Sequence, residues 1–249
     1  MFNNDLLQQW KKDEAVPFEG WDFSYLQGRM TEQTPPWDYI SLVKELVQKS
    51  TSLLDMATGG GEVFSQLAPF PHHTVAIEGW KPNVGIATTR LEPLGVQVIE
   101  ADPSKKLPFE NGEFDLVVNR HGGYTVEELR RILNRQGQFF SQQVGGDNLA
   151  DLEEFFNVKP KWPFNTLEYR IHEFEKQGFT IIKAQDWLGK VTFSDVGALV
   201  YFLKAVPWVV DNFSVETHLP YLKKLQEKLD KGQKLQFTYT RHFIHAKRE

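Results

Sequence analysis

The sequence contains no cysteine among its 249 residues, which excludes disulfide bonds, thiolate metal sites and a cysteine nucleophile. It also lacks a run of about 18 uncharged apolar residues, the length that a membrane-spanning helix needs. No apolar stretch follows the lysine pair near the N-terminus, as an export signal would require. We therefore expect a cytoplasmic protein that does not associate with a membrane.

Positive charge is also scarce, since 28 lysine and arginine residues stand against 33 acidic residues and give a net charge of -5. Nucleic-acid-binding surfaces need an excess of basic side chains, so a nucleic-acid partner is not expected. The C-terminal segment RHFIHAKRE is a small basic cluster that leaves structured RNA open as a substrate. The hydrophobic content of 41% is that of an ordinary globular protein.

Short apolar runs alternate with helix-like stretches from residue 52 onward, which predicts an α/β fold around a mostly parallel sheet. We expect one domain over residues 1–249. Its parts are an N-terminal aromatic cap (1–36), a core (37–187), an insertion or lid between strands six and seven (188–220), and a last helix and strand (221–249). The strands are expected at 52–56, 74–78, 96–100, 114–119, 138–145, 179–187 and 235–246.

The segment LLDMATGGGE predicts a strand, a glycine-rich turn and a helix beginning near Glu62. Such a turn lets a nucleoside approach bare backbone amides at the carboxyl end of a sheet. A dinucleotide fingerprint aligned on Gly59 and Gly61 would require a small residue where Phe64 stands. Phe64 therefore weakens the interpretation as a nicotinamide site.

The same segment resembles the first motif of the class I, Rossmann-like S-adenosylmethionine-dependent methyltransferases, with an acidic residue at the strand end before a glycine-rich turn. Ala57 stands where that family usually has its first glycine. The resemblance implies a seven-stranded Rossmann-like sheet, S-adenosylmethionine as cofactor, and methyl transfer. It places five residues at the cofactor, namely Asp55, Ala57, Thr58, Gly59 and Gly61.

Further segments resemble the family in the same order along the chain, LPFENGEFDLVVNRHG and EELRRILNRQGQFFSQQVG among them, so that the likeness covers about residues 38–187. It implies that Glu78 accepts hydrogen bonds from both ribose hydroxyls and that Asp102 contacts the adenine amino group. Gly79 and Asn119 complete the implied cofactor site. Each carboxylate could instead cap a turn or lie in solvent, but their ordered spacing favours a nucleoside site.

The methyl-accepting atom, whether N, O or C, is not specified by the sequence. The Asn/Asp-Pro-Pro-aromatic element of many amino-directed enzymes is absent after the fourth strand, where Asn119-Arg120-His121-Gly122-Gly123-Tyr124 stands instead. His121 is the candidate proton acceptor, because imidazole titrates near neutral pH. His242 and His245 would point to opposite faces of a strand, so we expect no catalytic metal.

Aromatic residues are concentrated in FEGWDFSYLQGRM, TPPWDY and ALVYFLKAVPWVV. The first two segments precede the first predicted strand of the core, and the third follows its sixth strand. In the enzymes that the sequence resembles, these two regions commonly cover the substrate, so we expect a dry pocket for a small, partly apolar substrate. Four residues are expected to line this pocket, namely Arg29, Trp37, Tyr39 and Tyr124. Two alternatives stay open: a nicotinamide-dependent oxidoreductase, and a nucleoside-binding module without catalytic activity.

Overall fold

The structure is a computed structural model that describes residues 4–18 and 21–249. Residues 1–3 and 19–20 of the expected N-terminal cap lie outside the described residues. The chain forms two compact units. The accessory unit comprises Met1–Pro35, Gly146–Pro163 and Leu188–Thr240, and the core unit comprises Pro36–Gly145, Phe164–Trp187 and Arg241–Glu249.

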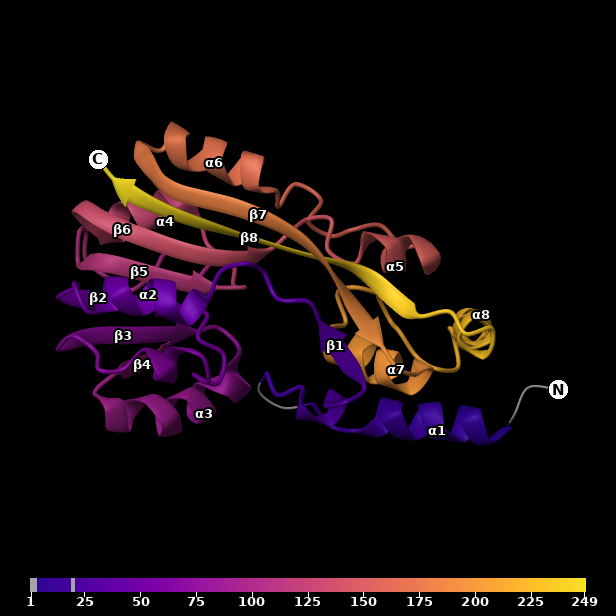
Figure 1. The fold of residues 1–249 in the computed structure, drawn as a ribbon. Coiled ribbons are helices and arrows are strands. Elements are labelled where there is room, and N and C mark those ends of the chain that lie inside the picture. Colours follow the sequence, from indigo (N-terminus) through magenta and orange to yellow (C-terminus); the bar gives the residue numbers. More distant parts are fainter. Residues whose placement is uncertain (1–3, 19–20) are drawn as a thin grey trace. The chain divides into compact units, whose positions relative to one another are not determined.

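The helices and strands follow one another in the alternating order that the sequence predicts (Figure 1). The α-helices are α1 (Asn4–Ala15), α2 (Tyr39–Val47), α3 (Lys81–Leu91), α4 (Val126–Ile132), α5 (Ala150–Phe155), α6 (Leu167–Lys176), α7 (Val196–Ala205) and α8 (Leu219–Asp230). Short 3-10 helices are η1 (Ser24–Leu26), η2 (Phe64–Leu67) and η3 (Glu92–Leu94). The strands are β1 (Met30–Glu32), β2 (Ser52–Met56), β3 (His73–Glu78), β4 (Gln97–Glu100), β5 (Phe114–Arg120), β6 (Leu133–Val144), β7 (Phe179–Phe193) and β8 (Leu235–Arg248).

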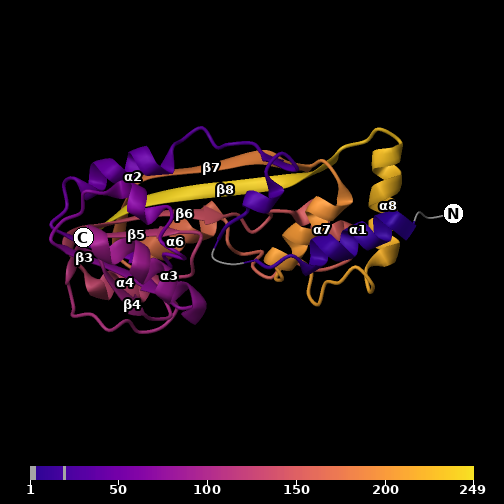
Figure 2. The same ribbon diagram turned by 90° about the horizontal axis from the view of Figure 1, so that it is seen from below.

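The sheet has the strand order β1-β7-β8-β6-β5-β2-β3-β4. Strands β6, β5, β2, β3 and β4 run parallel, and β8 pairs antiparallel with β6. Strands β7 and β8 lie side by side (Figure 2). The α/β Rossmann-like fold is therefore confirmed, but the sheet has eight strands where seven were expected. The additional strand, β1, has three residues paired with β7, too few to produce a detectable alternation in the sequence.

The two faces of the core-unit sheet bury separate hydrophobic clusters, because successive strand residues point to opposite faces. Leu53 packs with side chains of α2 and α3, whereas Leu54 packs with side chains of α4 and α6. The central strands are covered on both faces, which explains their continuous apolar runs. The carboxyl ends of β2, β3 and β5 are thereby held in register at one edge of the sheet.

The glycine turn after β2 leads into a single 3-10 turn and not into the α-helix expected from Glu62. Phe64 and Leu67 are buried in this turn, and the chain leaves it at Ala68 in an extended conformation before Pro69. Proline at positions 69 and 71 cannot donate the backbone hydrogen bonds that a continuing helix requires. The expected helix start is therefore corrected to η2.

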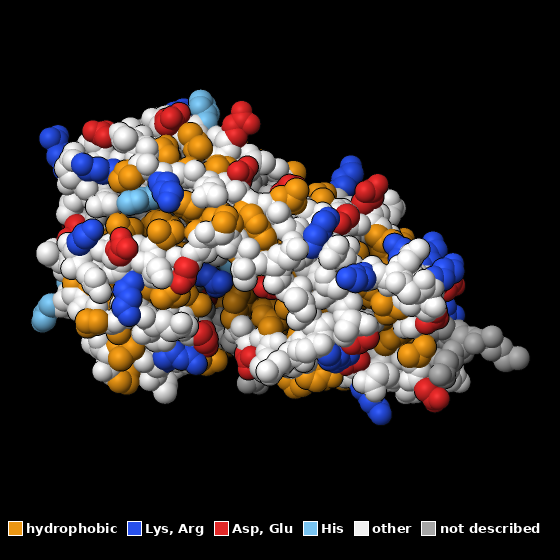
Figure 3. Space-filling view, viewed as in Figure 1, with side chains coloured by type: hydrophobic (Ala, Val, Ile, Leu, Met, Phe, Trp, Pro, Cys, Tyr) orange, Lys and Arg blue, Asp and Glu red, His pale blue; other side chains and the backbone are white. Residues whose placement is uncertain are grey.

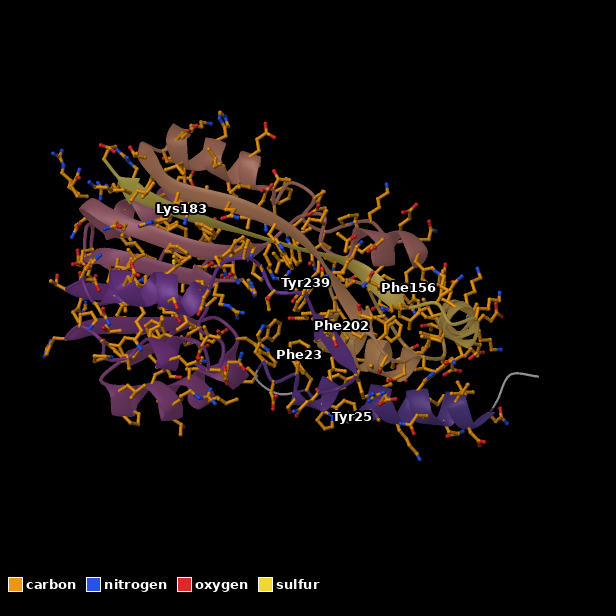
Figure 4. All side chains as sticks on the ribbon, viewed as in Figure 1. Phe23, Tyr25, Phe156, Lys183, Phe202 and Tyr239 are labelled. Carbon is orange, nitrogen blue, oxygen red and sulfur yellow. The ribbon has the colours of Figure 1, made fainter. Side chains whose placement is uncertain are left out.

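The accessory unit holds the aromatic residues that the sequence places in the cap and the insertion. Helix α1, which we did not expect, contacts α7 and buries Trp10. The rings of Phe23 and Phe202 point toward one another with centroids 6.1 Å apart (Figure 4). Trp21 stacks on Trp208 at 5.9 Å. Helix α1 escaped sequence analysis because its residues are mostly polar and only Trp10 and Asp13 are buried.

Candidate functional site

The turn after β2 is tight, and three of its residues adopt left-handed backbone conformations. Gly59 and Gly61 have φ angles of 63° and 79°, and the amide of Gly61 donates to the Thr58 carbonyl at 3.1 Å. Ala57 has a φ angle of 59°, at the position where a glycine was expected from the resemblance. A non-glycine residue in this region is strained. The backbone strain at Ala57 therefore makes the turn less stable than it would be with glycine at this position.

Glu78, at the end of β3, holds this turn in place. Its carboxylate accepts hydrogen bonds from the backbone amides of Gly59 and Trp80, both at 2.7 Å. The side chain is buried, so these charge-assisted bonds lie in a region of low dielectric constant. Each carboxylate oxygen retains a lone pair that could accept a further hydrogen bond. Glu78 therefore stabilises the conformation of the glycine turn through a hydrogen bond with the backbone of the turn itself.

Asp55 is buried within β2, two residues before the turn. Burial, followed by the nearby Glu78 carboxylate, raises the pKa of Asp55 to about 7. Carboxylates with pKa values shifted this far are concentrated at functional sites. A cationic ligand group beside Asp55 would lower its pKa again.

The turn has features that fit a nucleoside. A β-carbon added at Gly59 would meet no atom within 4 Å, so this side of the turn is open to a ligand. The Thr58 hydroxyl is buried close to the Asp55 carboxylate, and it lowers the pKa of Asp55, which partly offsets the effect of burial.

Gly79 and Asp102 lie at the adjoining strand ends. A β-carbon at Gly79 would be 3.4 Å from both the Ala101 carbonyl oxygen and the Asp102 Cα. The Asp102 carboxylate accepts from the backbone amide and hydroxyl of Ser104 at 3.0 and 2.6 Å, which lowers the pKa of Asp102. Asp102 therefore caps a turn, and part of its side chain remains exposed.

Asn119, expected at the cofactor, is fully buried and connects three strands. Its amide nitrogen donates to the Met56 carbonyl at 3.0 Å, and its oxygen accepts from the Ser141 hydroxyl at 3.2 Å and from Gln143. Next to it, a β-carbon at Gly122 would lie 2.3 Å from the Ala57 β-carbon. These contacts hold the end of β5 against the end of β2.

His121 follows β5 with a φ angle of 62° and is connected to Gln142 on β6. The two Nε2 atoms of His121 and Gln142 are 3.1 Å apart, and the Gln142 Oε1 accepts from Trp37 Nε1 at 2.8 Å. Burial, followed by the positive charge of Arg241 and Arg120, holds the pKa of His121 well below its ordinary value. Gln142 carries no recognisable signal in the sequence, because no motif marks a glutamine that acts through a histidine.

Tyr39 and Arg120 lie close together in the core unit. The Arg120 guanidinium carbon is 5.9 Å from the centroid of the buried Tyr39 ring. Burial and the nearby Asp55 raise the pKa of Tyr39. The structure therefore brings Trp37, Tyr39 and His121 to the same strand ends. Gln142 connects Trp37 with His121, and Arg120 lies over the Tyr39 ring.

Tyr124 and Arg29 have other surroundings. Tyr124 packs against Phe139 and Phe174, and Arg170 lies 5.1 Å above its ring. Burial raises the pKa of Tyr124 to about 12. Arg29 belongs to the accessory unit, where it forms bonds with two carboxylates.

Arg29 donates twice to Asp195, through Nε at 3.0 Å and Nη2 at 2.6 Å, and once to Asp13 at 2.9 Å. Asp13 is fully buried and also accepts from the Tyr25 hydroxyl at 2.7 Å. These bonds connect α1, the segment after η1 and the start of α7. Arg29 thus has a clear structural role within its unit.

The remaining charged residues form no concentrated site. Within residues 4–18 and 21–249, no group of three histidine or acidic side chains is arranged to hold a metal ion. Basic and acidic side chains are interspersed over the face seen in Figure 3. None of the helices in the described part of the chain is long and apolar enough to span a membrane.

Comparison with known proteins finds a family match within the core unit. A family model described as a methyltransferase domain matches residues 54–140. These residues include the glycine turn, Glu78, Asp102 and Asn119. No curated protein sequence matches the chain significantly.

Solved structures share the fold. A candidate methyltransferase from Bacillus halodurans C-125 has a TM-score of 0.61 at 17% identity, covering 84% of this chain and 98% of that one. An S-adenosylmethionine-dependent methyltransferase from Geobacter sulfurreducens, solved with S-adenosyl-L-homocysteine, has a TM-score of 0.53 at 14% identity, with coverages of 84% and 90%. A candidate sarcosine dimethylglycine methyltransferase from Galdieria sulphuraria has a TM-score of 0.52 at 11% identity, with coverages of 84% and 82%. Residues 54–140 therefore carry a methyltransferase domain, the chain has the Rossmann-like fold of S-adenosylmethionine-dependent methyltransferases, and the cofactor that this family implies is S-adenosylmethionine.

Proposed function

We propose that the protein transfers the methyl group of S-adenosylmethionine to a nitrogen, oxygen or carbon atom of a small, partly apolar molecule. The observation that carries this proposal is the open glycine turn held by the buried Glu78 carboxylate. The substrate is argued from the scarcity of basic residues and from the aromatic content of 13%.

The cofactor site in this proposal is the turn and the strand ends beside it. Glu78 binds the ribose hydroxyls, Asp102 and Gly79 face the adenine, and Thr58 lies beside Asp55 in the turn. Asp55 faces the cationic methionine end, Ala57 and Gly61 shape the turn, and Asn119 positions it through the Met56 carbonyl.

Trp80 is a further candidate contact that sequence analysis missed. Its backbone amide is bonded to Glu78, and its side chain is 52% exposed beside the turn. An exposed indole next to a ribose site can stack on a purine, an interaction worth about 1–3 kcal/mol. The sequence did contain a signal for this contact, namely an aromatic residue two positions after Glu78.

The chemistry follows from alignment of the reactants. When bound, S-adenosylmethionine would supply an electrophilic methyl group: the acceptor atom would bond to the methyl carbon as the carbon–sulfur bond breaks, and the thioether S-adenosylhomocysteine would leave. The residues of the chain orient the two reactants and exclude water, which can contribute up to about 7–11 kcal/mol. Trp37 and Tyr39 are suited to this role, because they hold aromatic surface at the same strand ends as His121.

The nicotinamide alternative is disfavoured by the packing of Phe64. This residue is buried and stacks on Phe70 with ring centroids 4.7 Å apart. A dinucleotide turn requires a small residue there, so that its helix can approach the strand closely. The chain has only the short helix η2 at this point.

A parallel calorimetric titration with S-adenosylmethionine, S-adenosylhomocysteine and NADH tests the proposal. We expect saturable binding of the two sulfur nucleosides and none of NADH. Glu78→Gln should weaken S-adenosylhomocysteine binding by about 1–3 kcal/mol, because a carboxylate acceptor is lost. Glu92→Gln, at an exposed glutamate on η3, is the matched control and should bind like the wild type.

Binding of NADH alone would overturn the proposal. Binding of the sulfur nucleosides without methyl transfer to any nitrogen, oxygen or carbon acceptor would instead favour the binding-module alternative. An unchanged affinity in Glu78→Gln would remove Glu78 from the ribose site.

A further inference from the structure

A polar chain of three side chains lies at the carboxyl ends of β5 and β6 in the core unit. Trp37 Nε1 donates to Gln142 Oε1 at 2.8 Å, and Gln142 Nε2 is 3.1 Å from His121 Nε2. The backbone fixes the same pair, because the His121 amide donates to the Gln142 carbonyl at 2.9 Å. Gln142 is buried, so water has little access to this connection.

The chain of bonds determines which nitrogen of His121 carries a proton. An indole N–H can only donate, so the Gln142 oxygen must face Trp37 and the Gln142 NH₂ group must face His121. An NH₂ group can only donate, so His121 Nε2 must accept. The imidazole is therefore neutral and carries its hydrogen on Nδ1.

This tautomer conflicts with the role of proton acceptor that the sequence suggests for His121. The Nε2 lone pair is already used by Gln142, and Nδ1 holds a hydrogen. His121 is thus suited to donate a hydrogen bond from Nδ1 rather than to remove a proton. Burial and the neighbouring cations also favour the neutral form, since they lower the pKa of His121.

The surroundings of His121 are positively charged. Arg120, Arg241 and His242 act on it electrostatically, whereas Asp55 is the acidic group that acts on Arg120 through space. Arg120 is half-buried and lies over the Tyr39 ring, and within the described residues no carboxylate pairs with it. A half-buried guanidinium without a carboxylate partner is a favourable site for an anion.

We propose that Gln142 holds His121 as a neutral Nδ1–H donor, and that His121 and Arg120 together bind a carboxylate group of the methyl-accepting substrate. Gln142 is then a positioning residue. This inference rests on the proposed function and narrows its substrate class to small carboxylic acids. A guanidinium and an imidazole N–H are the two donor types that recognise such a group.

The tautomer is tested by ¹⁵N NMR of histidine-labelled protein saturated with S-adenosylhomocysteine. We expect His121 to show an unprotonated Nε2 and a protonated Nδ1. Gln142→Glu should reverse this pattern, because a carboxylate facing Nε2 requires a hydrogen there, and should raise the pKa of His121. A protonated Nε2 in the wild type, or no change in the variant, would overturn the assignment.

The carboxylate site is tested with acetate as the probe, followed through the His121 ¹⁵N signals at constant ionic strength. The cofactor has a carboxylate of its own, so the titration is run on protein loaded with S-adenosylhomocysteine or with 5′-methylthioadenosine, which lacks that group. We expect saturable acetate binding in both cases. Saturation with 5′-methylthioadenosine alone would assign the site to the cofactor and overturn the substrate inference.

Arg120→Gln should weaken acetate binding at least tenfold, whereas Arg135→Gln, at an exposed arginine, should leave it unchanged. Equal acetate binding in both variants, or none in the wild type, would overturn the inference. The proposed function is judged separately, because the binding of S-adenosylhomocysteine is established before acetate is added.

Discussion

The contact between Ala57 and Gly122 provides a quantitative test of how the two strand ends are joined. A β-carbon at Gly122 would lie 2.3 Å from the Ala57 β-carbon and 2.9 Å from Asn119 Nδ2. Carbon atoms in contact are normally about 3.5–4.0 Å apart. The Ala57 β-carbon is attached directly to the backbone and cannot rotate away, so Gly122→Ala should destabilise the protein by about 3 kcal/mol, the upper end of overpacking costs.

The partner substitution, Ala57→Gly, should have the opposite effect. A left-handed conformation costs an L-residue about 1–2 kcal/mol, and Ala57 has a φ angle of 59°. The added freedom of glycine in the unfolded chain offsets about 0.4–1 kcal/mol of the gain. Ala57→Gly should therefore stabilise the protein by about 0.8 kcal/mol, from the difference between the midpoints of these two terms.

The double variant measures the contact itself. Without the Ala57 β-carbon, Gly122→Ala should be less destabilising by about 1 kcal/mol or more, which exceeds the deviation from additivity of about 0.3–0.5 kcal/mol shown by independent sites. Part of the cost remains, because Asn119 is unchanged. Urea unfolding with an unchanged m-value gives the four free energies. If the effects of Gly122→Ala and Ala57→Gly on the free energy of unfolding were additive, the contact between positions 57 and 122 would be refuted.

Three further predictions concern single residues. Asp55→Asn should remove a pH dependence of the free energy of unfolding. Because the folded-state pKa of Asp55 is raised from 3.8 to about 7, the wild type should lose stability relative to the variant as the pH rises through this window, by about 4 kcal/mol at most from about 1.4 kcal/mol per pKa unit. Unfolding curves of both proteins at pH 4 and pH 7 measure this loss, and an equal stability difference between the two proteins at both pH values would contradict the prediction. Trp80→Ala should weaken S-adenosylhomocysteine binding by about 1–3 kcal/mol and abolish any ligand-induced quenching that arises from the Trp80 indole. An unchanged affinity would show that the indole does not contact the nucleoside. Arg29→Gln should destabilise the accessory unit by about 3 kcal/mol, because the buried Asp13 loses its charged partner, and a circular-dichroism melt like that of the wild type would contradict this.

The core unit could be predicted from the sequence because its local signals agree. Helix α3 spans Lys81–Leu91 between strands β3 and β4, in keeping with the alternation of apolar runs and helix-like stretches that the sequence shows. Strands of continuous apolar residues between helices can pack only as a parallel sheet covered on both faces. The resemblance at Asp55, Glu78 and Asp102 added the family, which the methyltransferase match over residues 54–140 confirms.

What the sequence could not provide depends on contacts between distant residues. The strain at Ala57 is visible only from its φ angle, and its packing on Gly122 joins two strands that are far apart in the sequence. Gln142 has no motif, because its effect on His121 depends on which atom of its amide faces Trp37. Strand β1 and helix α1 have too few buried apolar residues for a recognisable period.

The most direct test of the cofactor site is an experimental structure of the protein with S-adenosylhomocysteine. The account predicts that both ribose hydroxyls lie within hydrogen-bond distance of the Glu78 carboxylate, with the glycine turn against the nucleoside and the adenine beside Asp102 and Trp80. A ligand bound elsewhere, or bound at this turn without contact to Glu78, would contradict it.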